Sequence, residues 1–121
     1  MKTFVLLLAA AGLLWAQDQD RAGNFTIRFG PDADLQTKVE VPFAIHVTDD
    51  LGKPVENAKV TLQIETPQHT NVQVFKAPAT DRGLYVAKPV FPSPGPWSVY
   101  VEVRRDGLLS ARTLEFTVPS S

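Results

Sequence analysis

Apolar and polar residues alternate along seven short segments of this chain, which is the pattern of β-strands with one buried face. The segments cover residues 25–29, 39–47, 58–64, 72–74, 84–90, 97–103 and 114–118. After residue 16, no window shows the three-to-four-residue spacing of an amphipathic helix. Seven short strands separated by Gly, Pro, Asp and Asn predict an all-β fold, a seven-stranded immunoglobulin-like β-sandwich.

The alternation also predicts which side chains enter the core. The residues expected to point inward are Phe25, Ile27, Phe29, Val39, Val41, Phe43, Ile45, Val47, Ala58, Val60, Leu62, Ile64, Val72, Val74, Leu84, Val86, Trp97, Val99, Val101, Val103, Leu114, Phe116 and Val118. Val90 is a further candidate for this set.

Prolines modify this pattern at two places. Pro42 falls inside the second segment, and because proline has no N–H to donate, we expect the strand to bend there or to lie at an edge. The stretch "FPSPGPW" at residues 91–97 predicts a rigid connection that delivers Trp97 to the core. A recognition surface is the alternative interpretation of this Pro-rich stretch.

Two other connections carry turn signals. In "DDLGKP", Asp49 and Asp50 can accept hydrogen bonds from backbone N–H groups two residues further on, and Gly52 supplies a positive φ. Asp106 and Gly107 separate the last two strands, and this dipeptide predicts a tight hairpin.

The first sixteen residues, "MKTFVLLLAAAGLLWA", have the layout of a secretory signal peptide, with Lys2, an apolar run and a small Ala16 before a polar stretch. The apolar run is shorter than the roughly 20 residues that span a bilayer. We therefore expect a signal peptide at 1–16, a flexible linker at 17–23 and one domain at 24–119, with an uncleaved membrane anchor as the alternative. The mature protein would be periplasmic or secreted and would not stay inserted in a membrane.

Composition excludes several classes of function. Removing residues 1–16 from the 121 leaves 105, which is enough for one sandwich. Without Lys2, 11 Lys and Arg stand against 13 Asp and Glu, so we expect no nucleic-acid partner. Cysteine is absent and Met1 is the only methionine, so the mature chain would contain no sulfur.

Four stretches together resemble a known family: "VPFAIHVTDDLGKPVENAKVTL", "DRGLYVAKPVF", "PGPWSVYVEVRRDG" and "LEFTV". Their most specific part is Gly83-x-Tyr85 followed by Gly95-x-Trp97. The chain is similar here to the YtkA-like/FixH-like domains, bacterial extracytoplasmic immunoglobulin-like sandwiches. The first stretch alone also suits carboxypeptidase-regulatory, transthyretin-like or bacterial Ig modules. The resemblance implies a small non-enzymatic accessory domain, whose relatives are linked with copper or other cation handling and with oxidase assembly.

The implied cation link directs attention to His69, His46 and Glu65 as candidate metal ligands. Many relatives carry Met and His in the loop that matches "ETPQHTNVQVFKAP", whereas this loop has His69 and no Met. Because Cu(I) prefers sulfur ligands, a Cu(II) or zinc site is the alternative that these residues leave open. His46 is out of phase with the buried residues around it, and the two histidines lack the spacing of a closed zinc site. We therefore expect solvated histidines and no cofactor.

Catalytic signals are weak. Ser98, Ser110, Asp49 and Asp81 are present, but no serine lies in a Gly-x-Ser-x-Gly elbow and no Gly-rich phosphate loop occurs. A sandwich core is also filled by its own side chains. We therefore expect no enzymatic activity and no catalytic residues.

Two interpretations of function remain, and both include a protein partner. The first is an accessory or binding domain of the YtkA-like type. The second is a structural interaction module without a metal role, which pairs through an exposed sheet edge or through outward strand faces. Tyr100 faces away from the predicted core, and we expect it to form a contact patch with Arg104 and Arg112.

Overall fold

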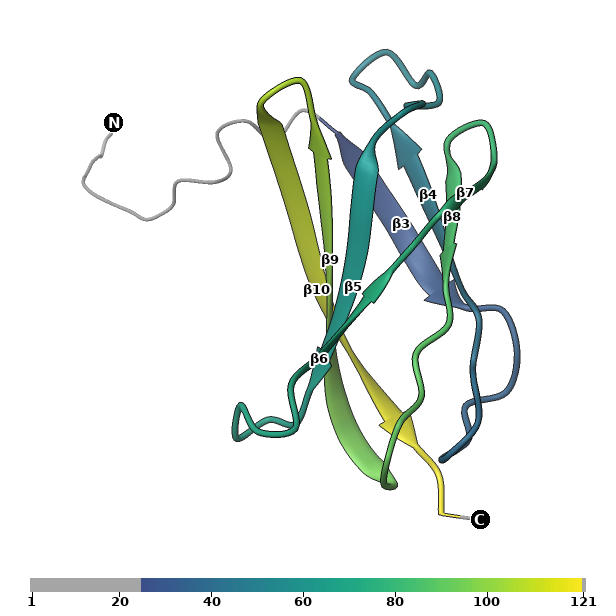
Figure 1. Ribbon diagram of the computed structural model, residues 1–121, viewed down its shortest axis with the longest axis vertical. Helices are drawn as coiled ribbons and strands as arrows, with labels where there is room; N and C mark the ends of the chain where they lie inside the picture. Colours follow the sequence, from purple (N-terminus) through teal and green to yellow (C-terminus); the bar gives the residue numbers. More distant parts are fainter. Residues whose placement is uncertain (1–24, 121) are drawn as a thin grey trace, which may run out of the picture.

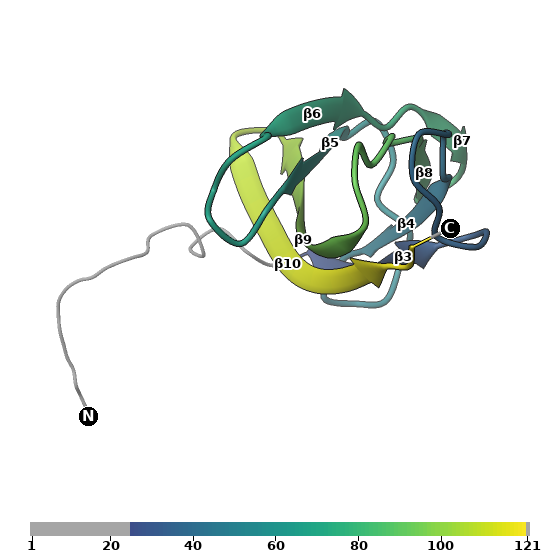
Figure 2. The same ribbon diagram turned by 90° about the horizontal axis from the view of Figure 1, so that it is seen from below.

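A computed structural model describes residues 25–120, in which eight strands form two four-stranded antiparallel sheets (Figure 1). The first sheet has the order β10 (Leu108–Val118), β9 (Gly95–Arg105), β5 (Lys59–Glu65) and β6 (Gln73–Lys76). The second has the order β3 (Thr26–Pro31), β4 (Phe43–Thr48), β8 (Leu84–Ala87) and β7 (Ala79–Asp81). The two sheets face each other as layers (Figure 2). The predicted signal peptide at 1–16 and linker at 17–23 lie outside the described residues.

The predicted β-sandwich is confirmed, but the strand number of seven is wrong. The additional strand is β7, whose three residues are all exposed. It pairs with β8 through a register shift between Ala79 and Asp81. A strand this short, without a buried face, has no alternation from which the sequence could reveal it. Within residues 25–120, no helix is long and apolar enough to cross a membrane.

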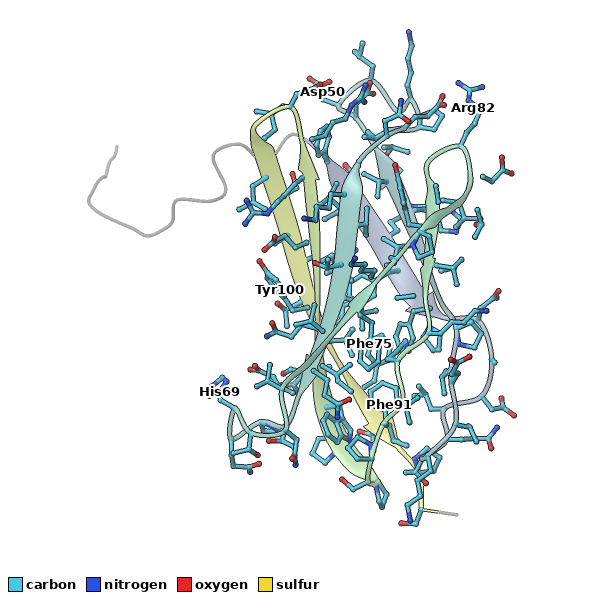
Figure 3. The ribbon with its side chains drawn as sticks, in the orientation of Figure 1. Asp50, His69, Phe75, Arg82, Phe91 and Tyr100 are labelled. Atoms are coloured by element: carbon cyan, nitrogen blue, oxygen red, sulfur yellow. The ribbon has the colours of Figure 1, made fainter. Side chains whose placement is uncertain are left out.

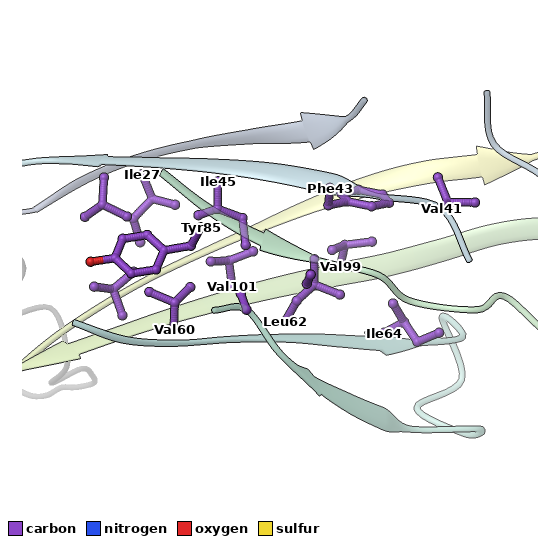
Figure 4. Close-up of a cluster of buried hydrophobic side chains, with 14 of the residues drawn as sticks. Ile27, Val41, Phe43, Ile45, Val60, Leu62, Ile64, Tyr85, Val99 and Val101 are labelled. Atoms are coloured by element: carbon purple, nitrogen blue, oxygen red, sulfur yellow. The ribbon is translucent and has the colours of Figure 1, made fainter. Parts of the chain in front are cut away.

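The core lies between the sheets, and it includes inward side chains of β4 in one sheet and of β5 and β9 in the other (Figure 4). The predicted inward residues of these strands are confirmed, and each is at most 4% exposed: Phe43, Ile45, Val47, Val60, Leu62, Ile64, Trp97, Val99, Val101 and Val103. Aromatic rings pack edge-on at one end, with ring centroids 5.4 Å apart for Phe43 and Phe116 and 5.7 Å apart for Phe91 and Trp97. Because these side chains occupy the space between the sheets, functional groups have to lie on the surface.

The predicted phase of β6 is wrong. Val72 and Val74 are 48% and 60% exposed, whereas the ring of Phe75 packs against the core. Residues on both faces of this strand are apolar, so the alternation alone does not decide which face is buried. The larger aromatic side chain gains more from burial and takes the inward position.

The phase of β8 is also the reverse of the prediction. Tyr85 and Ala87 are buried, whereas Leu84 and Val86 are only half-buried. The Tyr85 hydroxyl donates to the Val55 carbonyl at 2.8 Å and accepts from the Ala58 N–H at 3.2 Å. These two hydrogen bonds make a buried tyrosine acceptable, because its polar end is satisfied.

Pro42 marks the start of a strand. β4 begins at Phe43 and lies between β3 and β8, so the prediction of an edge strand is wrong. Regular pairing stops at Pro42 and resumes as a single bridge between Glu40 and Val90, which agrees with an interruption of the segment at the proline.

The residues before Pro42 are irregular, and the Val41 N–H donates to the Pro89 carbonyl at 3.0 Å. Val41 is buried, as predicted, but Val39 is 45% exposed and does not point inward. Side chains alternate between two faces only in extended backbone, and Val39 lies before the regular strand begins.

The first predicted turn is confirmed at Asp49. Its Oδ1 atom accepts the N–H groups of Leu51 and Lys53, both at 2.9 Å. Gly52 has a φ of 80°. The hydrogen bond from Lys53 is the main reason that the pKa of Asp49 lies below its ordinary value. Asp50 lies at the tip of this loop, and its carboxylate makes no hydrogen bond to the described part of the chain (Figure 3).

The two remaining connections also agree with prediction. Asp106 and Gly107 have φ values of 52° and 77° and join Arg105 to Leu108 in a two-residue hairpin. Trp97 is 1% exposed, and its indole N–H donates to the Ser93 carbonyl at 2.9 Å, within the Pro-rich connection.

Candidate functional site

Two of the three predicted metal candidates lie together. Glu65 ends β5, and His69 lies in the loop that follows, with its Nδ1 atom 2.5 Å from Glu65 Oε2. The loop is closed by Thr66, whose hydroxyl donates to the Thr70 carbonyl at 3.1 Å. The His69 side chain is 79% exposed and points away from the sandwich (Figure 3). The Glu65 side chain is only 18% exposed, and its other oxygen, Oε1, accepts from Gln63 Nε2 at 3.3 Å. The pair therefore offers mainly the imidazole to solvent.

The third candidate, His46, lies elsewhere. It belongs to β4 in the second sheet, where its side chain is exposed, as its phase predicts. Glu65 and His69 belong to the first sheet and its loop. Among residues 25–120, no group of three or more His, Cys, Asp or Glu is arranged to hold a metal ion. The structure thus brings His69 and Glu65 together and leaves His46 apart.

The two candidate nucleophilic serines lie on different strands of the first sheet. The Ser110 hydroxyl accepts the Phe25 N–H at 3.3 Å, which ties β10 to the residue before β3. Ser98 lies on β9 opposite Glu65. Within the described range, neither histidine is hydrogen-bonded to a serine.

The outward face of the first sheet carries a second polar group of residues, here called the outer-face network: Tyr100, Glu102 and Arg104 of β9. The Tyr100 hydroxyl donates to Glu102 Oε1 at 2.9 Å, and Arg104 Nε donates to Glu102 Oε2 at 2.6 Å. Partial burial, together with the neighbouring Glu102 carboxylate, raises the pKa of Tyr100 to about 12. Burial acts to raise the pKa of Glu102, but the hydrogen bonds from Arg104 and Tyr100 outweigh it, so this pKa is lowered.

Arg112 does not join this network, so that part of the predicted contact patch is wrong. It is paired with Val101, which faces the core, and therefore lies on the opposite face from Tyr100. Its Nη1 atom donates to the Ile27 carbonyl of β3 at 2.8 Å. Together with Ser110, Arg112 closes the side of the sandwich between β10 and β3.

The opposite side of the sandwich is more open. β6 ends the first sheet, and the chain then crosses to β7, which ends the second (Figure 1). The Ala77 N–H donates to the Val60 carbonyl at 2.9 Å, so this pair is hydrogen-bonded. Hydrogen-bonded pairs alternate along antiparallel strands, so Phe75 also directs its backbone groups toward β5. Val74 and Lys76 therefore direct theirs toward the free edge of β6.

Residues 77–78 join β6 to β7 across the two sheets and are here called the crossing segment. Two hollows flank it. The β5–β7 hollow has a volume of about 400 Å³ and is lined by Asn57, Ala58, Lys59, Val60, Thr61, Lys76, Ala77, Pro78, Ala79 and Tyr85. The β6–β8 hollow has a volume of about 440 Å³ and is lined by Val74, Phe75, Lys76, Pro78, Val86 and Lys88. Both have apolar walls and lysines, and within residues 25–120 no carboxylate lines either of them. The free edge of β6 thus borders an apolar hollow with basic side chains.

A third hollow continues along the same side and differs in charge. Its volume is about 310 Å³, and it is lined by Glu56, Asn57, Ala79, Asp81, Arg82 and Tyr85. Arg82 Nε lies 2.8 Å from Glu56 Oε2, so the guanidinium is paired with a carboxylate. Both side chains are largely exposed, so we assign little stabilisation to this pair. Of the three hollows, the two nearest β6 are the ones lined by lysines with no carboxylate from residues 25–120.

Sequence reasoning anticipated an exposed sheet edge but did not identify the residues on it. Because Val72 and Val74 were predicted to point inward, the sequence did not reveal that these valines lie on the surface. Lys76 and Lys88 lie in different segments, and only the crossing of the chain between the sheets brings them to one hollow. A signal was present in "NVQVFK", because its single aromatic residue is out of phase with its valines.

Comparison with known proteins gives a family match and a structural match. The YtkA-like family model matches residues 20–102, which is 83 of the 121 residues. A crystal structure of a DUF4785 family protein from Legionella pneumophila subsp. pneumophila str. Philadelphia 1 is similar with a TM-score of 0.50 and 12% identity. The match covers 82% of this chain but 29% of that one, so it shows similarity of fold alone. No curated protein matches the sequence.

Proposed function

This chain belongs to the YtkA-like family, and from that premise we propose that it is an extracytoplasmic, non-enzymatic accessory domain that binds a protein partner through β6. Export is supported by the signal-peptide layout of residues 1–16. A non-enzymatic role is supported by the filled core.

One observation carries the proposed binding role: β6 is an edge strand whose free backbone groups are flanked by exposed apolar side chains. Val72 is 48% exposed and Val74 is 60% exposed. An edge of this kind is a template for an additional strand unless something covers it. The opposite edges of the two sheets are tied together by Ser110 and Arg112, which leaves the β6 side as the open one.

Site-specific photo-cross-linking in the organism of origin tests this role. A photoreactive amino acid placed at Val74 should give one discrete cross-linked product, because this side chain lies beside the free edge. The matched control is the same amino acid at Arg28, which is exposed on β3 in the other sheet. Equal products from both positions, or none from Val74, would show that β6 is not the binding surface.

A narrower role in cation handling has one observation in its favour, the pairing of Glu65 with His69. Nitrogen and oxygen donors suit Cu(II) or Zn(II) better than Cu(I). A cation held by this pair would need further ligands from water or from a partner, because His46 is on the other sheet. Calorimetric titration with Cu(II), Zn(II) and Cu(I) tests the role, with His69→Ala as the variant and His46→Ala as the control. Binding that His69→Ala leaves unchanged would exclude this pair.

A further inference from the structure

We infer that the partner presents an extended acidic segment, which joins β6 as an additional strand and places an apolar side chain in the β6–β8 hollow. This inference rests on the proposed function, because it specifies the chemistry of the partner at the same edge. It also accounts for the gathering of three lysines beside β6, which the proposed function alone does not explain.

The backbone of β6 defines how such a segment would lie. Val74 and Lys76 offer their N–H and C=O groups at the free edge, so they are the residues that would exchange hydrogen bonds with an added strand. The side chains of that strand would alternate between the two faces of the extended sheet. Those beside Phe75 would point toward the inter-sheet side, where Phe75, Pro78 and Val86 form the apolar wall of the hollow.

Charge indicates the sign of the partner. Lys59 and Lys76 line the β5–β7 hollow, and Lys76 and Lys88 line the β6–β8 hollow. Within the described range, the linings of these two hollows include no aspartate or glutamate. Carboxylates on an added strand would therefore lie near lysines on both sides of the crossing segment. Among residues 25–120, no carboxylate in the lining of either hollow would compete with them for those lysines.

The same charges argue against a second copy of this chain as the occupant. An antiparallel pair of β6 strands related by a two-fold axis would bring together the lysines of both copies around one edge. Like charges gathered in this way repel each other and disfavour the pairing. Lysine on an edge strand is a known means of preventing self-association. A partner of opposite charge could form hydrogen bonds with the free backbone groups of β6 without that repulsion.

Nuclear magnetic resonance titration of the protein with three blocked hexapeptides tests the inference. The peptides alternate valine with glutamate, with serine or with lysine, and they share length and apolar content. We expect the glutamate peptide to shift the amide signals of Val74 and Lys76, and to bind about tenfold more tightly than the serine peptide at low salt. This advantage should shrink as the salt concentration rises.

Charge-reversal variants locate the effect. Lys76→Glu and Lys88→Glu should each reduce the preference for the glutamate peptide, and Lys76→Glu should favour the lysine peptide. Lys53→Glu carries the same charge change in the exposed loop between β4 and β5 and should leave the preference intact. Because all three lysines are exposed, these variants should fold, which circular dichroism can verify.

The possible outcomes separate the inference from the proposed function. Equal binding of all three peptides at β6 would overturn the acidic preference and leave the edge as a binding surface. A failure of every peptide to shift Val74 and Lys76 would overturn both. Self-association of Lys76→Ala without any charge preference among the peptides would show that Lys76 only protects the edge, and would also overturn the inference.

Discussion

The hydroxyl group of Tyr85 helps to set which side chains of β8 point into the core. Its ring is 2% exposed, and its hydroxyl connects two backbone groups of the segment that leads into β5. Removing that hydroxyl leaves the Val55 carbonyl and the Ala58 N–H without this partner. An unsatisfied buried polar group costs about 1–3 kcal/mol.

Tyr85→Phe should therefore lower the free energy of unfolding by about 1–3 kcal/mol in urea denaturation. The matched control is Tyr100→Phe, which removes a hydroxyl from the partly exposed outer-face network and should have a smaller effect. Equal losses for the two variants would contradict the structural role assigned to the Tyr85 hydroxyl.

The raised pKa of Tyr100 leads to a prediction at alkaline pH. In the folded state its pKa is about 12, and in the unfolded chain it returns to about 10. Between these values the folded protein retains a proton that the unfolded chain has lost, so this tyrosine reduces stability as the pH rises.

Spectrophotometric titration of the phenol absorbance, compared between the unmodified protein and Tyr100→Phe, should show that Tyr100 titrates above the ordinary pKa of a tyrosine. Glu102→Gln should lower that pKa, because the carboxylate that accepts the hydroxyl proton is lost. The shift should be incomplete, since burial is the larger cause. An unchanged pKa in Glu102→Gln would show that the hydrogen bond does not contribute.

Two glycines with left-handed backbone differ in the space around them. Gly83 has a φ of 67°, and a Cβ atom there would lie 2.6 Å from the Cβ of Pro54 and 3.0 Å from the Val47 carbonyl oxygen. Gly52 has a φ of 80°, but its Cβ would meet nothing within 4 Å. The first position combines backbone strain with a clash, and the second has backbone strain alone.

Gly83→Ala should accordingly destabilise the protein by about 3 kcal/mol, and Gly52→Ala by about 1 kcal/mol, in thermal or urea unfolding. Their difference isolates the close approach of the β7–β8 turn to Pro54. Equal effects would mean that this approach is looser than the geometry indicates.

At the scale of elements, alternation predicted the phase of β4, β5 and β9 and failed for β6 and β8. β4, β5 and β9 contact strands on both sides, and their apolar and polar residues occupy separate faces, so their phase could be read from sequence. β6 and β8 carry apolar residues on both faces, and their phase depends on the positions of Phe75 and Tyr85. The short β7 carries no pattern at all. The candidate site was hidden because it lies where these weakly patterned strands meet.

The corrected phase of β6 can be tested with two substitutions. Phe75→Ala should lower the free energy of unfolding by about 2 kcal/mol, since a partly buried ring leaves the core. Val74→Ala should leave stability nearly unchanged, because that side chain is 60% exposed. Urea denaturation measures both, and a larger loss for Val74→Ala would restore the phase predicted from sequence.

At the scale of the molecule, the two sides of the sandwich differ. Arg112 and Ser110 connect β10 to the β3 side through hydrogen bonds at 2.8 and 3.3 Å. On the other side, the crossing segment leaves a free strand edge between two hollows with lysines. A domain with a filled core and an edge strand that is free among residues 25–120 suits a role in binding, because the edge offers backbone hydrogen bonds without any rearrangement of the fold.

Amide hydrogen exchange at β6 tests this role most directly. In the free protein, the Val74 and Lys76 amides should exchange faster than that of Phe75, which faces β5. On addition of the protein captured by cross-linking from position 74, both amides should become protected. Unchanged exchange at Val74 and Lys76, with protection on another surface, would contradict the assignment of β6 as the binding edge.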